Sequence, residues 1–179
     1  RRNARGVSIL LSEDDAPEER DDGAPIEVLE AYFEARGWAC ERSGEGEIIA
    51  SAPGSWAQYE LRGVWRPEDQ VLQFLAFPDI KVGGDKRLAI YETLGLVNEQ
   101  LWLGHFELWS GSGLVVFRYS ALIDAGEDDG LTFEQAEAIT EAALEECERF
   151  YPVFQFVLWG GKSPSEAISA ALIDTAGEA

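Results

Sequence analysis

The stretch Asp85–Trp109, DKRLAIYETLGLVNEQLWLGHFELW, decides the expected fold, because its apolar spacing changes from a helical period to a strand period. As far as Gly104, large apolar side chains recur every three or four residues, which predicts an amphipathic helix. Asp85 follows two glycines and is the expected N-cap, and Gly104 is expected to end the helix in a left-handed conformation. The apolar face comprises Leu88, Tyr91, Leu94, Leu101 and Trp102, with Val97 and Asn98 on or beside it.

After this helix the apolar residues alternate with polar ones, which is typical of a half-buried strand. His105–Trp109 is therefore expected to be a strand with Phe106 and Leu108 on one side and its other three residues on the opposite side. A turn at Gly111–Gly113 and a second strand at Leu114–Ser120 would complete a hairpin.

Upstream, the chain predicts one helix followed by an antiparallel meander. The helix covers Pro25–Arg36, has a regular apolar face and ends at Gly37. Short turns separate the next four apolar segments, and short connections join antiparallel strands. The expected face of the helix is Ile26, Leu29, Tyr32 and Phe33, and the strands are Trp38–Ser43, Glu47–Ala52, Ala57–Trp65 and Val71–Phe77.

Downstream, two capping boxes predict two helices. Thr132 and Gln135 begin a long helix, which Pro152 is expected to interrupt or kink. The segment Phe150–Trp159 is apolar nearly all round, so it is expected to be fully buried or to lie in a protein interface. Ser163–Glu166 is a second capping box and begins a short helix.

The resulting order is helix, four strands, helix, two strands, long helix, short helix, which predicts an α+β fold with helices packed on a mainly antiparallel sheet. Residues 24–179 are expected to form a single domain, and residues 1–23 a flexible, acidic N-terminal arm. The arm contains the apolar segment Val7–Leu11, which could add as a strand to a sheet edge of its own chain or of a neighbouring chain.

The charge balance restricts the partners. The chain has 34 acidic and 14 basic residues, for a net charge of −20. Nucleic-acid phosphates and anionic lipids repel such a chain, so neither nucleic acid nor a membrane is an expected partner. Basic proteins are favoured instead. No apolar run reaches the roughly 18 residues of a membrane-spanning helix.

No catalytic, cofactor-binding or metal-ligating residue is predicted. His105 is the single histidine, no nucleophile elbow is present, and the usual zinc ligands are too few. Lys81–Arg87 lacks the order of a phosphate-binding loop, and a capped turn is the better interpretation. The acidic loop 124–129 departs from the calcium-loop pattern, although weak cation binding there stays open.

Three motifs stand out in the chain, Asn98–Phe106, Glu148–Pro152 and Trp159–Glu166, together with Gly37-Trp38 and the strand Tyr59–Trp65. They resemble the bacterial YbjN family, which is described as a family of sensory transduction regulators. The resemblance extends over residues 25–171 and implies a fold similar to that of type III secretion chaperones. Those chaperones are small, acidic, usually dimeric proteins that bind polypeptides, so the resemblance implies a cytoplasmic, non-catalytic protein and transfers no catalytic residue.

The leading hypothesis is a non-catalytic, protein-binding regulatory or chaperone-like module, with a homodimer as one possibility. Aromatic side chains dominate binding hot spots, so exposed members of one aromatic set are the candidate contacts. One alternative is a small-ligand-binding protein or enzyme with a pocket between sheet and helices, lined by His105 and acidic residues. Another is an acidic mimic of nucleic acid that binds a basic protein. The candidate contacts are Trp56, Trp65, Trp109, Phe154 and Trp159.

Overall fold

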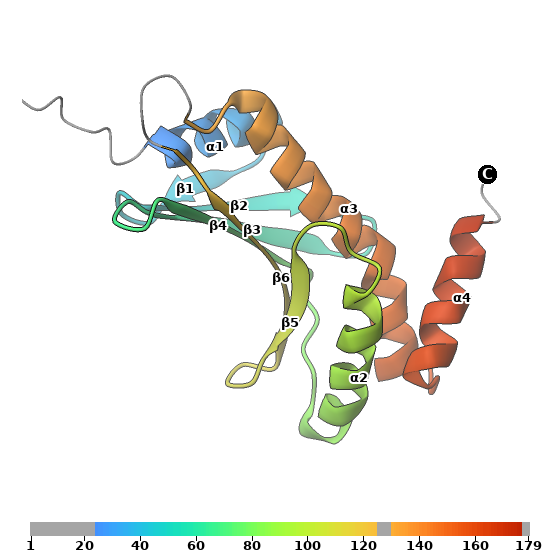
Figure 1. Ribbon diagram of the computed structural model, residues 1–179. Helices are drawn as coiled ribbons and strands as arrows, with labels where there is room; N and C mark the ends of the chain where they lie inside the picture. The colour runs from blue at the N-terminus through green and yellow to red at the C-terminus, as the bar shows by residue number, and fades with distance from the viewer. Residues whose placement is uncertain (1–23, 125–129, 177–179) are drawn as a thin grey trace, which may run out of the picture.

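The computed structural model of the chain describes residues 24–124 and 130–176, which form a six-stranded antiparallel sheet and four α-helices (Figure 1). This confirms the predicted α+β class. The expectations for residues 1–23 and for most of the loop 124–129 lie outside the described residues. In chain order the elements are α1 Ala24–Ala35, β1 Cys40–Arg42, β2 Glu47–Pro53, β3 Gln58–Arg66, β4 Val71–Phe77, the 3-10 turn η1 Gly84–Lys86, α2 Arg87–Asn98, β5 His105–Trp109, β6 Leu114–Leu122, α3 Phe133–Leu158 and α4 Pro164–Ala176.

The sheet joins the predicted meander and the predicted hairpin into one surface, with strand order β1-β2-β3-β4-β6-β5. β6 inserts between β4 and β5, so that β5 becomes an edge strand. The register places Gly63 opposite Phe74, and Phe74 opposite Tyr119. At the edge, Phe106 lies opposite Phe117. All five pairings are antiparallel, as the short connections predict.

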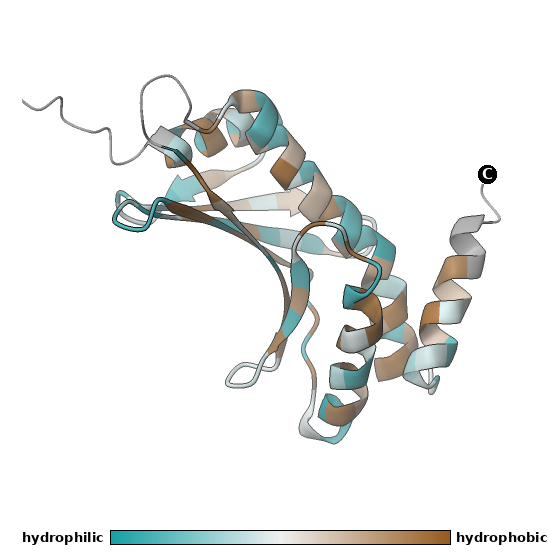
Figure 2. Cartoon of the chain, viewed as in Figure 1, coloured by the Kyte–Doolittle hydropathy of each residue, from teal (hydrophilic) through white to brown (hydrophobic). Residues whose placement is uncertain are grey.

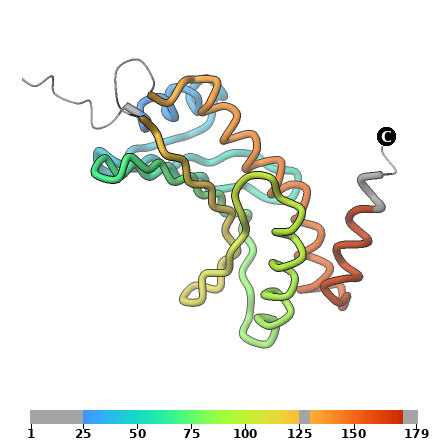
Figure 3. Tube along the Cα trace, viewed as in Figure 1, coloured from blue at the N-terminus to red at the C-terminus, as the bar shows by residue number. Residues whose placement is uncertain are grey.

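The helices cover one face of the sheet (Figure 1). α1 contacts β1, β2 and β3, whereas α3 crosses β4 and β6 and α2 packs against β5. α4 lies outside this layer against α2 and α3 (Figure 3). Along each helix hydrophobic and hydrophilic residues alternate, as expected for a helix with one buried side (Figure 2). The predicted apolar face of α1 is confirmed, since Ile26, Leu29, Tyr32 and Phe33 are all buried.

The centre of the core is a cluster of four phenylalanine rings between the β5–β6 hairpin and the second half of α3. The ring of Phe106 lies 5.3 Å from that of Phe117, 6.0 Å from that of Phe150 and 5.6 Å from that of Phe154. All four side chains are almost completely buried. The apolar character of Phe150–Trp159 therefore reflects burial within its own chain, except at the exposed Trp159.

The predicted buried face of α2 is confirmed only at Leu94 and Val97. Leu88, Tyr91 and Trp102 are exposed, at 84%, 46% and 98% of their surface. Ile90 and Thr93, which were not expected on this face, are buried beside Leu94 and Val97. The helix carries two apolar stripes of helical spacing, and contact with α3, α4 and β5 decides which one is buried. Thr93 can be buried because its hydroxyl donates to the carbonyl of Ala89 at 2.7 Å.

The predicted ends of α2 are also wrong. Asp85 lies within η1 and does not cap the helix, which begins at Arg87. The helix ends at Asn98, whose side-chain amide bonds to both backbone groups of Phe106, at 2.8 and 3.0 Å. This clamp fixes the start of β5. Gly104 does adopt the predicted left-handed conformation, with φ of 71°, but it lies after the helix has ended.

Both capping boxes are confirmed. The Thr132 hydroxyl accepts from the backbone N–H of Gln135, whose side chain accepts from the backbone N–H of Thr132. Ser163 and Glu166 form the same reciprocal pair at the start of α4. Of the two outcomes expected at Pro152, an interruption or a kink, the interruption is wrong, because α3 continues unbroken to Leu158. Proline removes one helix hydrogen bond, and burial of the residues around it compensates.

Candidate protein-binding site

The five aromatic candidates fall in different environments. Trp65 and Phe154 are buried in the core, at 6% and 1% exposure, so they are not available to a partner. Trp109 is half-buried on the sheet face that carries no helix. Trp56 and Trp159 are exposed, and the ring of Trp56 stacks on that of Tyr151. The structure therefore does not bring the five together into one surface.

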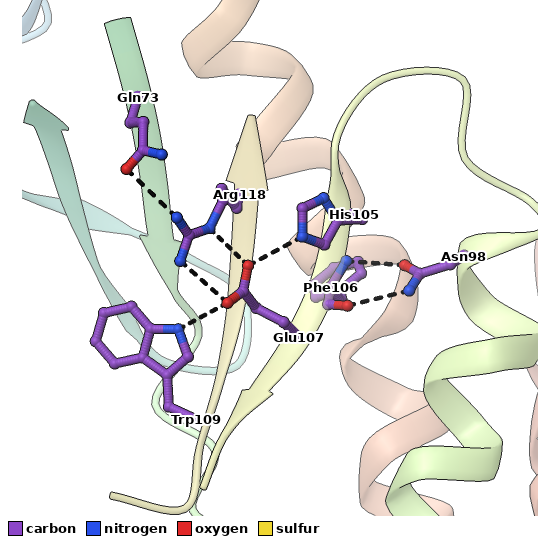
Figure 4. A network of polar contacts seen from close by, with 7 residues as sticks. All are labelled: Gln73, Asn98, His105, Phe106, Glu107, Trp109 and Arg118. Atoms are coloured by element: carbon purple, nitrogen blue, oxygen red, sulfur yellow. Dashed lines mark hydrogen bonds and ion pairs between the residues drawn. The ribbon is translucent and has the colours of Figure 1, made fainter. Parts of the chain in front are cut away.

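The sheet face opposite the helices carries a polar network centred on Glu107 (Figure 4). Its carboxylate accepts two hydrogen bonds from the Arg118 guanidinium, at 2.6 and 3.1 Å. It also accepts from the Trp109 indole at 3.0 Å and bonds to the His105 ring at 2.9 Å. The remaining side of the guanidinium reaches the amide oxygen of Gln73 at 3.4 Å. His105 thus takes part in a structural network, as expected for a strand residue.

Beside this network a small apolar cluster is buried without a covering helix among the described residues. Leu75, Phe77 and Val116 are nearly inaccessible to solvent. The ring of Trp109 meets that of Phe77 at 5.3 Å, and the guanidinium of Arg62 lies 4.9 Å from the same ring. Charged and amphipathic side chains therefore close this face, with their stems on the apolar surface and their polar ends in solvent.

Partial burial raises the pKa of Glu107, but the hydrogen bonds from Arg118 and Trp109 outweigh it and hold the pKa below its ordinary value of 4.5. A carboxyl group whose pKa is lower in the folded state than in the unfolded state stabilises the fold. This stabilisation is complete above the unfolded-state pKa and is lost as the pH falls through the folded-state pKa.

Glu107→Gln is therefore expected to reduce the free energy of unfolding by about 1–2 kcal/mol near pH 7. The difference from the wild type should shrink below pH 4.5 in urea unfolding curves measured across the acid range. A difference that does not change with pH would contradict this role of the carboxylate.

Besides a hollow of about 380 Å³ over β1, β2 and β3, the structure has a concave feature on the helix side, between β6 and the first half of α3. It is an apolar groove of about 320 Å³. Among the described residues that line it, the side chains are hydrocarbon apart from the Gln135 amide and the Tyr119 hydroxyl, and neither His105 nor an acidic side chain is one of them. This lining lacks the convergent polar groups that small-ligand and catalytic pockets usually present. The residues of this edge groove are Leu103, Phe117, Tyr119, Ala121, Leu122, Ile123, Leu131, Gln135, Ala138, Ile139 and Ala142.

The groove lies along a strand edge that pairs with no other strand in the described part of the chain. Pairing of β5 with β6 stops where His105 meets Arg118, whereas β6 continues to Leu122 beside β4 alone. The backbone N–H of Ile123 donates toward β4, to Gln70 at 2.9 Å. Alternate residues of a strand direct their backbone groups to opposite sides. The backbone groups of Ser120 and Leu122 consequently point away from β4, to the side where the described chain places no strand.

Exposed apolar side chains border this edge. Leu103 and Leu122 are groove residues exposed at 54% and 83%, and Trp102 beside Leu103 is exposed at 98%. Contiguous exposed apolar surface on a folded protein usually marks an interaction site. The sequence prediction missed these residues because it assigned Trp102 to the buried face of a longer helix. The signal in the sequence that could have revealed them is that the second strand of the hairpin, β6, is longer than the first, β5.

Among the described residues, no group of three or more His, Cys, Asp or Glu side chains is arranged to hold a metal ion. The helices in the described ranges also include none with the length and hydropathy needed to cross a lipid bilayer. The site that the structure does define is an apolar groove with a free strand edge, on an α+β protein.

This chain belongs to the YbjN family, whose sequence model carries the description "Putative bacterial sensory transduction regulator" and matches residues 25–156. YbjN from E. coli, known from a crystal structure, is 13% identical, with 74% of this chain and 88% of that chain covered and a TM-score of 0.48. A chain of the ExsC-ExsE complex is 18% identical, with 73% and 93% covered and a TM-score of 0.46. No curated protein sequence is detectably similar to this chain.

Proposed function

We propose that this protein is a non-catalytic, protein-binding module of a regulatory or chaperone-like kind, acting in the bacterial cytoplasm. The observation that carries the proposal is the coincidence of the apolar edge groove with the unpaired edge of β6. Together they fit an extended segment of a partner protein. The family description, which names a regulator of signalling, supports the same class of function.

The edge and the groove supply different parts of the binding free energy. Backbone groups of Ser120 and Leu122 can pair with an added strand, which provides affinity independent of sequence. Side chains of that strand alternate in direction, so every second one would enter the groove and provide specificity. Because this surface is short, the complex is expected to be transient, with a dissociation constant in the micromolar range.

The strong negative charge of the chain adds a preference for partners with basic residues near their apolar segment. The net charge is −20, and such a field speeds encounter with a cationic surface and repels an anionic one. Trp56, Trp109 and Trp159 are the remaining aromatic candidates for additional contacts, since each is at least partly accessible. A second copy of this chain is one protein that the edge could bind.

The test is selection of peptides from a random displayed library on the full-length chain. We expect the selected peptides to carry apolar residues at alternate positions. Ala138→Arg places a long side chain across the groove from an exposed helix position, so it should weaken their binding by about tenfold or more. Ala31→Arg makes the same change on the exposed surface of α1 and should leave binding unchanged.

Either of two results would count against the proposal. Peptides that bind the Ala138→Arg variant as tightly as the wild type would show that the edge groove is not the site. A library that yields no binding peptide at all would remove the protein-binding interpretation of this surface.

A further inference from the structure

We infer that, when no partner is bound, the edge groove holds the segment Val7–Leu11 of the same chain, added as a strand to the free edge of β6. The inference rests on the proposed function, because it concerns the same groove. It adds that a segment of the protein itself competes with the partner for the edge groove.

The sequence of the segment matches the groove in spacing and polarity. In an extended conformation Val7, Ile9 and Leu11 point to one side. The helix-facing side chains of β6 follow the same alternation, at Tyr119 and Ala121, and both line the groove. Residues on paired strands have their side chains in register on each face. Three apolar side chains of the segment can therefore lie in the apolar groove.

The tether between the segment and the domain is long enough. α1 begins at the end of the molecule where β6 ends and α3 starts (Figures 1 and 3). Twelve residues, Ser12–Gly23, separate Leu11 from that helix. They can span up to about 40 Å when extended. The groove residues on α3 lie between Gln135 and Ala142, within about 10 Å along the helix axis.

Connection through such a tether gives the segment a high local concentration. A short flexible linker produces effective concentrations in the millimolar range. A segment with even a weak intrinsic affinity would thus occupy the groove for most of the time. A partner must then displace it, which makes the N-terminal arm an autoinhibitory element.

Charge favours the same placement. Arg1, Arg2 and Arg5 precede the apolar segment directly. Exposed acidic residues are sequence neighbours of the groove residues, since Glu134 and Glu137 lie on the first turns of α3. Opposite charges attract, and the attraction is screened by salt.

Hydrogen exchange of the full-length chain tests the inference directly, because an added strand would protect the backbone amides of Ser120 and Leu122. We compare the wild type with a variant carrying Val7→Ser, Ile9→Ser and Leu11→Ser. Leu10→Ser is the matched control, since it changes an apolar residue on the opposite side of the segment. The two amides should exchange about tenfold more slowly in the wild type and the control than in the triple variant.

Dilution identifies the source of the strand. Protection by the same chain does not depend on protein concentration, whereas protection by a second copy is lost on dilution. Protection that disappears on dilution would overturn the inference in favour of exchange between two copies. Equal exchange rates in the wild type and the triple variant would overturn it altogether.

A labelled peptide of Arg5–Ser12 separates this inference from the proposed function. It should bind the triple variant at least about tenfold more tightly than the wild type, where the intact arm competes. Ala138→Arg, added to the triple variant, should abolish that binding. If library peptides bind the groove and this peptide does not, the inference is wrong and the proposed function stands. If no peptide binds, both are wrong.

Discussion

Phe106→Ala is expected to lower the free energy of unfolding by about 3–5 kcal/mol, a large share of the stability of a domain of this size. The ring of Phe106 contacts those of Phe117, Phe150 and Phe154, all within 6.0 Å between centroids. It thereby joins the β5–β6 hairpin to the second half of α3. Alanine would leave a cavity among aromatic rings that cannot easily move inward. Urea unfolding followed by tryptophan fluorescence measures the loss.

Leu122→Ala is the control for this substitution. Leu122 is also an apolar residue of the same hairpin, but it is 83% exposed. Its replacement should change the free energy of unfolding by no more than about 0.5 kcal/mol. A loss below about 1 kcal/mol for Phe106→Ala would show that the four rings do not form the rigid centre of the core.

Gly104→Ala is expected to cost about 2–4 kcal/mol, from backbone strain and overpacking together. Gly104 has a φ of 71°, which L side chains rarely adopt. A Cβ atom there would collide with the ring of Phe117 and would lie 2.8 Å from the carbonyl oxygen of Arg118. Relief of the collision would shift the neighbouring Leu103, so binding to the edge groove should weaken as well. Unfolding curves and peptide binding measure the two effects.

The same substitution at Gly95 should have the opposite sign. Gly95 lies in the interior of α2, and no atom approaches its would-be Cβ within 4 Å. Gly95→Ala is expected to raise the free energy of unfolding by about 0.5–1 kcal/mol, because alanine favours the helix. Similar losses at both glycines would contradict the argument from the conformation of Gly104.

Local patterns predicted most of the elements, because each depends on residues close together in the chain. Apolar alternation located all six strands to within a few residues, and the two capping boxes located the starts of α3 and α4. Only part of the α2 face, Leu94 and Val97, could be predicted in this way. Leu88 and Ile90 both belong to apolar stripes of helical spacing, and only packing against distant elements buries one of them.

The candidate site depends on tertiary alignment, which explains why the sequence did not reveal it. The predicted strands His105–Trp109 and Leu114–Ser120 already differ in length, and in the structure β6 extends further, to Leu122. That difference leaves a free edge only because β6 lies between β4 and β5. Aromatic content alone was a poor guide, since Trp65 and Phe154 are core residues.

The insertion of β6 between β4 and β5 also affects the order of folding. The strands β1 to β4 pair with neighbours close in sequence, so their contacts form after the closure of short loops. The β4–β6 pair joins residues about forty to fifty positions apart, with all of α2 in the intervening loop. We therefore expect the antiparallel strands β1 to β4 to pair early in folding and β4 to pair with β6 late.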